Sequence, residues 1–122
     1  MNIPTRVLVV DDEPAVRRLL EAVLQKGGFI TAQAGDAEEA AELLAAGDFD
    51  LAFVDVHLPD ESGIDLVRRA VEAGSATQFI LITGALDSGE RSDAFDCGAK
   101  TILRKPFRTT DVLYAADLLL ER

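Results

Sequence analysis

Short unbroken apolar runs alternate along this chain with longer stretches whose apolar residues recur at helical spacing. Three of the runs, residues 6–10, 51–54 and 79–82, are rich in Val, Ile, Leu and Phe. Runs of this kind are typical of strands buried on both faces of a sheet. Residues 30–34 are a weaker strand candidate, and residues 101–104 are predicted to form a short last strand. Strict alternation of strands and helices requires right-handed crossovers, which predicts a parallel sheet with helices on both faces.

Proline, glycine and a capping pair mark the ends of the first two of five predicted helices. The first has Pro14 in its opening turn and ends at Gly27, and its apolar stripe consists of Val16, Leu19, Leu20, Val23 and Leu24. Proline at the start and glycine at the end are the usual helix boundaries. The second helix follows Asp36, which has Glu39 three residues on as in a capping box, and it stops at Gly47.

The remaining three helices differ in how many apolar residues can anchor them. Residues 63–73 form the third, which ends at Gly74. Residues 88–97 offer only Ala94, Phe95 and Cys97 as apolar contacts, so this helix should be short, weakly packed and the most mobile. The last helix is predicted to be capped by Thr109 or Thr110, and its apolar face is formed by Val112, Leu113, Ala116, Leu119 and Leu120.

Composition narrows the class of protein. The length of 122 residues and 48% hydrophobic content predict one domain spanning residues 1–122 with a single core. A formal charge of −10 repels phosphodiester backbones and anionic lipids, so this domain is not expected to bind nucleic acid or a membrane surface. No apolar run approaches the ~20 residues that span a bilayer, and the single cysteine, Cys97, favours a cytoplasmic protein.

Polar residues follow four of the predicted strands. The first strand leads into Asp11 and Asp12, the third ends in Asp55, the fourth in Thr83 and the fifth in Lys105. A polar residue after a strand is usually just the first solvated position. Parallel strands, however, deliver their carboxyl ends to one edge of the sheet, where ligands bind. The convergence of all five residues therefore predicts a functional site.

The three acids at this edge point to metal and phosphoryl chemistry. Neighbouring carboxylates repel one another unless a cation compensates, and Mg²⁺ suits such a site because it takes oxygen ligands and leaves room for phosphate oxygens. The chain contains neither of the glycine-rich motifs of nucleotide-binding loops, G-x-x-x-x-G-K-[ST] and G-x-G-x-x-G. A phosphoryl group would then be attached to the protein itself, with Asp55 as the carboxylate nucleophile.

Over essentially its whole length the chain resembles the receiver domains of bacterial two-component response regulators. The resemblance rests on Asp11-Asp12, on Asp55 followed by Leu58-Pro59 and Gly63, on Thr83-Gly84, and on Lys105-Pro106-Phe107. It implies a flavodoxin-like, doubly wound, five-stranded parallel sheet of order 2-1-3-4-5 with five helices.

The resemblance also implies a role for each site residue. Asp55 would accept a phosphoryl group from the phosphohistidine of a sensor histidine kinase or a phosphotransfer protein. Asp12 would bind Mg²⁺ directly and Asp11 through water, with Asp55 and the backbone carbonyl of His57 completing the metal site. Such a protein catalyses only its own phosphorylation and dephosphorylation, so it is not otherwise an enzyme.

Other residues would serve the phosphoryl group or the outgoing signal. Thr83 and Lys105 would bind its oxygens, Gly84 would leave its approach open, and the peptide bond before Pro106 would be cis. Where the family carries an aromatic residue, three positions before the lysine, this chain has Ile102. Its stiff side chain has little area to swing, so the signal should rely more on movement of residues 84–98. Members of the family often dimerise through the last two helices.

Two other functions compete with this interpretation. A haloacid-dehalogenase-like phosphatase also uses an aspartate nucleophile and Mg²⁺, but it needs a second acid two residues later, where this chain has His57. A receiver-like interaction module that is never phosphorylated would keep the fold without the chemistry, and the intact set of site residues argues against it. The partner kinase and the output cannot be read from the residues.

Overall fold

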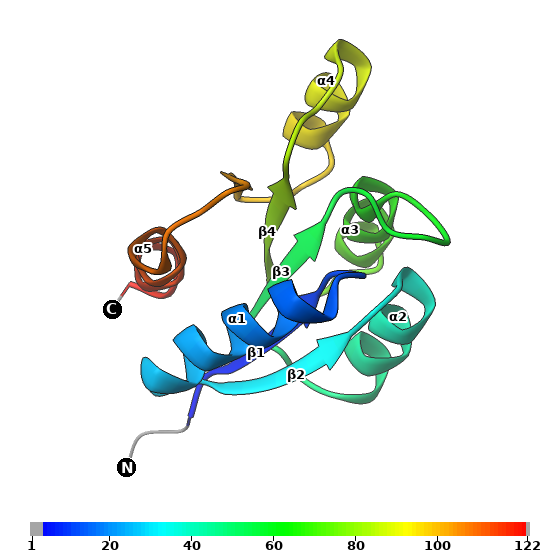
Figure 1. Ribbon diagram of the computed structural model, residues 1–122. Helices are drawn as coiled ribbons and strands as arrows, with labels where there is room; N and C mark the ends of the chain where they lie inside the picture. Colours follow the sequence, from blue (N-terminus) through cyan, green and yellow to red (C-terminus); the bar gives the residue numbers. More distant parts are fainter. Residues whose placement is uncertain (1–3, 122) are drawn as a thin grey trace.

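A computed structural model describes residues 4–121 as an open parallel sheet with helices on both faces (Figure 1). The elements are β1 (Arg6–Val10), α1 (Pro14–Lys26), β2 (Ile30–Ala34), α2 (Ala37–Ala46), β3 (Leu51–Asp55), α3 (Gly63–Glu72), β4 (Gln78–Thr83), α4 (Ser88–Asp96), β5 (Thr101–Arg104) and α5 (Thr109–Leu120). The strands pair in the order β2-β1-β3-β4-β5, and every pairing is parallel. The predicted fold and strand order are confirmed.

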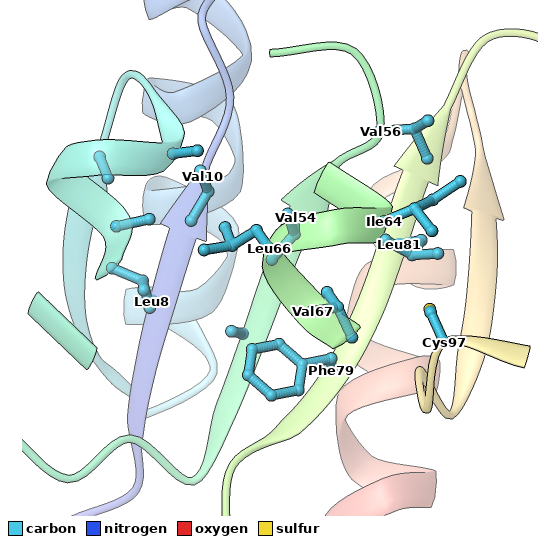
Figure 2. Packing of buried hydrophobic residues seen from close by; sticks show 14 of the residues in the cluster. Leu8, Val10, Val54, Val56, Ile64, Leu66, Val67, Phe79, Leu81 and Cys97 are labelled. Atoms are coloured by element: carbon cyan, nitrogen blue, oxygen red, sulfur yellow. The ribbon is translucent and has the colours of Figure 1, made fainter. Parts of the chain in front are cut away.

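Alternate residues of the central strands face two separate cores. On one face Val54 and Leu81 pack with Leu66 and Val67 of α3, as Figure 2 shows, and α2 and α4 complete this layer. The other core joins α1 and α5 to the intervening strand residues, such as Phe53. Because both faces are covered, the strands read as continuous apolar runs. Each fully buried large aliphatic side chain contributes about 1.5–3 kcal/mol.

The strands extend slightly beyond their apolar runs. β3 includes Asp55, which pairs with Ile82, and β4 runs on to Thr83, which pairs with Arg104. These polar residues therefore belong to the sheet itself. Ladder hydrogen bonds fix their backbones, and this holds their side chains at the carboxyl edge.

The helix boundaries agree with the predictions except at two caps. In α2 the Asp36 carboxylate accepts a hydrogen bond from the Glu39 N–H at 2.8 Å, but the Glu39 side chain accepts from Gly35 N–H instead of Asp36 N–H. The predicted cap of α5 at Thr109 or Thr110 is wrong. The helix begins at Thr109, and the N–H of the preceding residue, Arg108, donates to the Asp111 carboxylate at 2.9 Å.

α4 packs as weakly as its sequence predicts. Ala94 and Cys97 are buried, but the third predicted contact, Phe95, is wrong: this residue is 73% exposed. A reciprocal capping box between Asp87 and Glu90 secures the first turn. Within residues 4–121, none of the helices has the length and apolar character that a membrane crossing requires.

Candidate functional site

The carboxyl ends of the strands bring the predicted site residues to one edge of the sheet. Asp11 follows β1, and Asp55 ends β3, which pairs directly with β1. Within residues 4–121, Asp11, Asp55 and Thr83 are the only polar or charged residues that are buried, at 0%, 5% and 2% exposure. Asp12 is exposed, yet one carboxylate oxygen each from Asp11, Asp12 and Asp55 lies within 4.8 Å of the others.

Lys105 follows β5, and its side chain lies beside this cluster of three carboxylates. Its Nζ lies 2.9 Å from Asp55 Oδ2, 2.9 Å from Asp11 Oδ2 and 3.5 Å from Glu13 Oε1. The Lys105 N–H donates to the Thr83 carbonyl at 2.8 Å, and the Lys105–Pro106 peptide bond is cis as predicted. The ammonium group thus bridges the two buried carboxylates.

Burial and charge act in opposite directions on these groups. Burial raises the pKa of Asp11, and the neighbouring Asp55 charge adds to that rise, although interaction with Lys105 opposes it. Burial by itself lowers the pKa of Lys105, but its close attraction to the carboxylates of Asp11 and Asp55 outweighs burial and raises the pKa. Lys105 is therefore charged at neutral pH. One ammonium offers a single positive charge to three neighbouring carboxyl groups, so a further cation would relieve their mutual repulsion.

The donor set fits a hard divalent cation such as Mg²⁺. Asp11 Oδ2 is fully buried and, within residues 4–121, is the one buried side-chain oxygen or nitrogen without a hydrogen bond. Its ion-pair contact with Lys105 is close, but the direction does not complete a hydrogen bond. An unsatisfied buried acceptor is costly. A cation, or water bound to one, would satisfy it together with the carboxylates of Asp12 and Asp55.

The loop between β3 and α3 orients the Asp55 carboxylate. The His57 N–H donates to Asp55 Oδ1 at 2.9 Å, and Lys105 holds Oδ2, so both oxygens of Asp55 have a partner. The imidazole of His57 is 57% exposed, and its Nε2 lies 2.8 Å from Glu90 Oε2 of α4. Sequence reasoning missed this link, because no local pattern signals a pair 33 residues apart.

Gly63 allows α3 to begin against the backbone of Asp55. A Cβ at this position would lie 2.0 Å from the Asp55 carbonyl oxygen, which no side chain can tolerate. The Gly63 N–H donates to the Val56 carbonyl at 2.7 Å, closing the base of the loop. This close approach of the two backbones requires glycine at position 63.

The remaining predicted residues lie on β4, β5 and the loops that follow them. The Thr83 hydroxyl donates to the Ala85 carbonyl at 2.9 Å. The space beside Gly84 is open, since a Cβ there would meet no atom within 4 Å. Ile102 is half-buried on β5 and pairs with Leu81, so it lies inside the sheet and the carboxylates lie at its edge.

Comparisons with known proteins agree with this fold. Residues 7–117 match the family described as "response regulator receiver domain". The protein PetR of Rhodobacter capsulatus is 34% identical over 119 residues, which cover 98% of this chain and 50% of PetR. The chain spans about half the length of the first curated relatives it matches.

Solved structures that share this fold include response regulators and their receiver domains. A CheY-like receiver domain protein from Methanospirillum hungatei has a TM-score of 0.92 at 27% identity, covering 98% of this chain and 96% of that one. The response regulator TrrA from Thermotoga maritima, solved in complex with Mg²⁺-BeF, has a TM-score of 0.84 at 31% identity, covering 94% and 98%. The chain therefore belongs to the response regulator receiver domain family.

Proposed function

We propose that this receiver domain is a phosphorylation switch whose acceptor is Asp55. The observation that carries the proposal is the position of the Asp55 carboxylate. It lies between the Lys105 ammonium and the His57 N–H, beside two further acids. A carboxylate oxygen of Asp55 attacks the phosphorus of a phosphohistidine on a kinase or phosphotransfer protein. The P–N bond breaks, its electrons return to the imidazole, and an acyl phosphate forms on Asp55.

The chain's own residues supply positioning and charge for this transfer. Lys105 holds Asp55 before the reaction and can turn to the new phosphoryl oxygens afterwards. The Thr83 hydroxyl leaves the Ala85 carbonyl to donate to one of those oxygens. Phosphoryl transfer depends mainly on such placement and on neutralising the equatorial oxygens. Pro106 shapes the turn that presents Lys105, and Gly84 keeps the approach open.

Mg²⁺ is the proposed cofactor. Asp11, Asp12, Asp55 and the backbone carbonyl of His57 would hold the ion, which supplies positive charge for the phosphoryl oxygens when bound. The unsatisfied Asp11 oxygen and the carboxylate cluster support this assignment. So does TrrA, whose structure was determined in complex with Mg²⁺-BeF.

The signal leaves through residues around α4 in this proposal. Ile102 offers no aromatic ring to rotate, and few buried side chains hold α4 in place. A kinase or phosphotransfer protein is the expected partner. The exposed Phe95, Tyr114 and Leu118 on α4 and α5 support dimerisation through these two helices. We place the protein in the cytoplasm.

Incubation with acetyl phosphate and Mg²⁺, followed by intact-mass measurement, tests the proposal. The wild-type chain should gain the mass of one phosphoryl group, and Asp55→Asn should gain none. Asp93→Asn removes an exposed carboxylate of α4 and should behave as wild type. A wild-type chain that stays unmodified, or an Asp55→Asn variant that is modified, would contradict the assignment.

A turnover assay separates the switch from the phosphatase alternative. A phosphatase hydrolyses a generic phosphomonoester such as p-nitrophenyl phosphate repeatedly, whereas the switch should release no product from it. The residue two positions after Asp55 is His57 and not an acid, which favours the switch.

A further inference from the structure

The loop after Asp55, residues 56–62, is a closed hairpin whose tip lies against α2. The Gly63 N–H donates to the Val56 carbonyl, and His57 and Ser62 form an antiparallel bridge across the base. Beyond this base the loop projects past the end of the sheet, on the side where α2 begins (Figure 1). Asp60 is at this tip.

Asp60 binds the first turn of α2 with both of its carboxylate oxygens. Oδ1 accepts from the Ala37 N–H and Oδ2 from the Glu38 N–H, each at 2.9 Å. The next N–H, that of Glu39, is accepted by Asp36 at 2.8 Å. The first N–H groups of a helix have no partner within the helix. Here two of them are satisfied by a residue more than twenty positions away in the chain.

This contact and one other join the loops that surround the carboxylates. The Asp11 N–H donates to the Ala34 carbonyl at the end of β2, only three residues before α2 begins at Ala37. The base of the 56–62 loop holds the His57 N–H that donates to Asp55. Asp60 therefore connects the loop after β3 to the start of α2, and the Asp11–Ala34 hydrogen bond connects the end of β2 to the loop after β1.

We propose that Asp60 is a positioning residue for the metal and phosphorylation site. By fixing the tip of the 56–62 loop on α2, it keeps the His57 backbone in register with Asp55. The inference rests on the proposed function, because that function gives His57 its role as a backbone ligand. Asp60 itself is not among the proposed ligands of the metal or of the phosphoryl group.

Paired variants at α2 separate positioning from helix capping. Asp60→Asn replaces one acceptor with an amide N–H donor facing the helix N–H. Asp36→Ala removes the other cap of the same helix, which is the acceptor for the Glu39 N–H, without touching the loop. Both should lower the urea midpoint. Only Asp60→Asn should weaken Mg²⁺ binding, measured by calorimetry, by about 10-fold, which is typical of groups that support a metal ligand. It should also slow phosphorylation by acetyl phosphate.

A second variant breaks the same contact from the helix side. Glu38→Pro removes the N–H that Asp60 Oδ2 accepts, and proline is tolerated in the first turn of a helix. It should weaken Mg²⁺ binding in the same direction, so the test does not depend on Asp60→Asn folding. Equal Mg²⁺ affinity in Asp60→Asn, Asp36→Ala and wild type would overturn the inference.

The two proposals fail in different ways. If the wild-type chain is phosphorylated and the α2 variants share its Mg²⁺ affinity, Asp60 is only a helix cap and the proposed function stands. If the wild-type chain takes no phosphoryl group, the proposed function fails, and calorimetry still decides whether Asp60 positions the metal site.

Discussion

Replacing Gly63 with alanine places a methyl group against the backbone of Asp55. The new Cβ would lie 2.0 Å from the Asp55 carbonyl oxygen and 3.0 Å from Val54 Cγ1. Real Cβ contacts essentially never fall below 3.0 Å, so the start of α3 and the end of β3 must separate by about 1 Å. The obstacle is backbone and not a flexible side chain, so no rotamer change relieves it.

Two measurable losses follow from that displacement. Overpacking costs about 1–3 kcal/mol, and the entropic gain of replacing glycine returns only about 0.4–1 kcal/mol. The urea midpoint should therefore fall. Because Asp55 moves with its backbone, phosphorylation by acetyl phosphate should slow by about 100-fold, the typical result of a 1 Å misplacement.

Gly89→Ala provides the matched control. This glycine lies in the first turn of α4, where a Cβ would meet only Asp87 Oδ1 at 3.5 Å. It should leave stability unchanged or raise it by up to about 1 kcal/mol. Unchanged stability together with an unchanged phosphorylation rate in Gly63→Ala would refute the steric argument, because the predicted clash would then not exist.

Three further predictions concern the site and α4. Burial raises the pKa of Asp11, so without Mg²⁺ the stability that this group contributes is present at acid pH and is lost as pH rises through its folded-state pKa. Asp11→Asn should therefore raise the urea midpoint at neutral pH and abolish stabilisation by Mg²⁺. A midpoint below that of wild type would contradict this. Gly84→Leu should fold as wild type, since the space beside it is open, but should accept phosphoryl groups more slowly; an unchanged rate would remove the access argument. On phosphorylation, amide exchange should change most across residues 84–98, and uniform protection there would count against α4 as the moving element.

Sequence patterns alone determined the layered fold and the five residues at the strand ends. Strand and helix periodicities are local, and the edge at which parallel strands end follows from their direction. The sequence by itself therefore assigns five residues to one edge of the sheet: Asp11, Asp12, Asp55, Thr83 and Lys105. The metal, phosphoryl and individual residue roles came from their chemistry and from the family resemblance.

Tertiary structure decided which of those groups are buried and what holds them. Asp11 is buried and the adjacent Asp12 is exposed, although the sequence presents them as equivalent acids. The outward turn of Phe95 and the contact of Asp60 with α2 were equally absent from the patterns. Such features depend on how one helix packs against a distant loop. Periodicity reports only which residues share a face of one element, so these contacts became visible only once the elements were assembled.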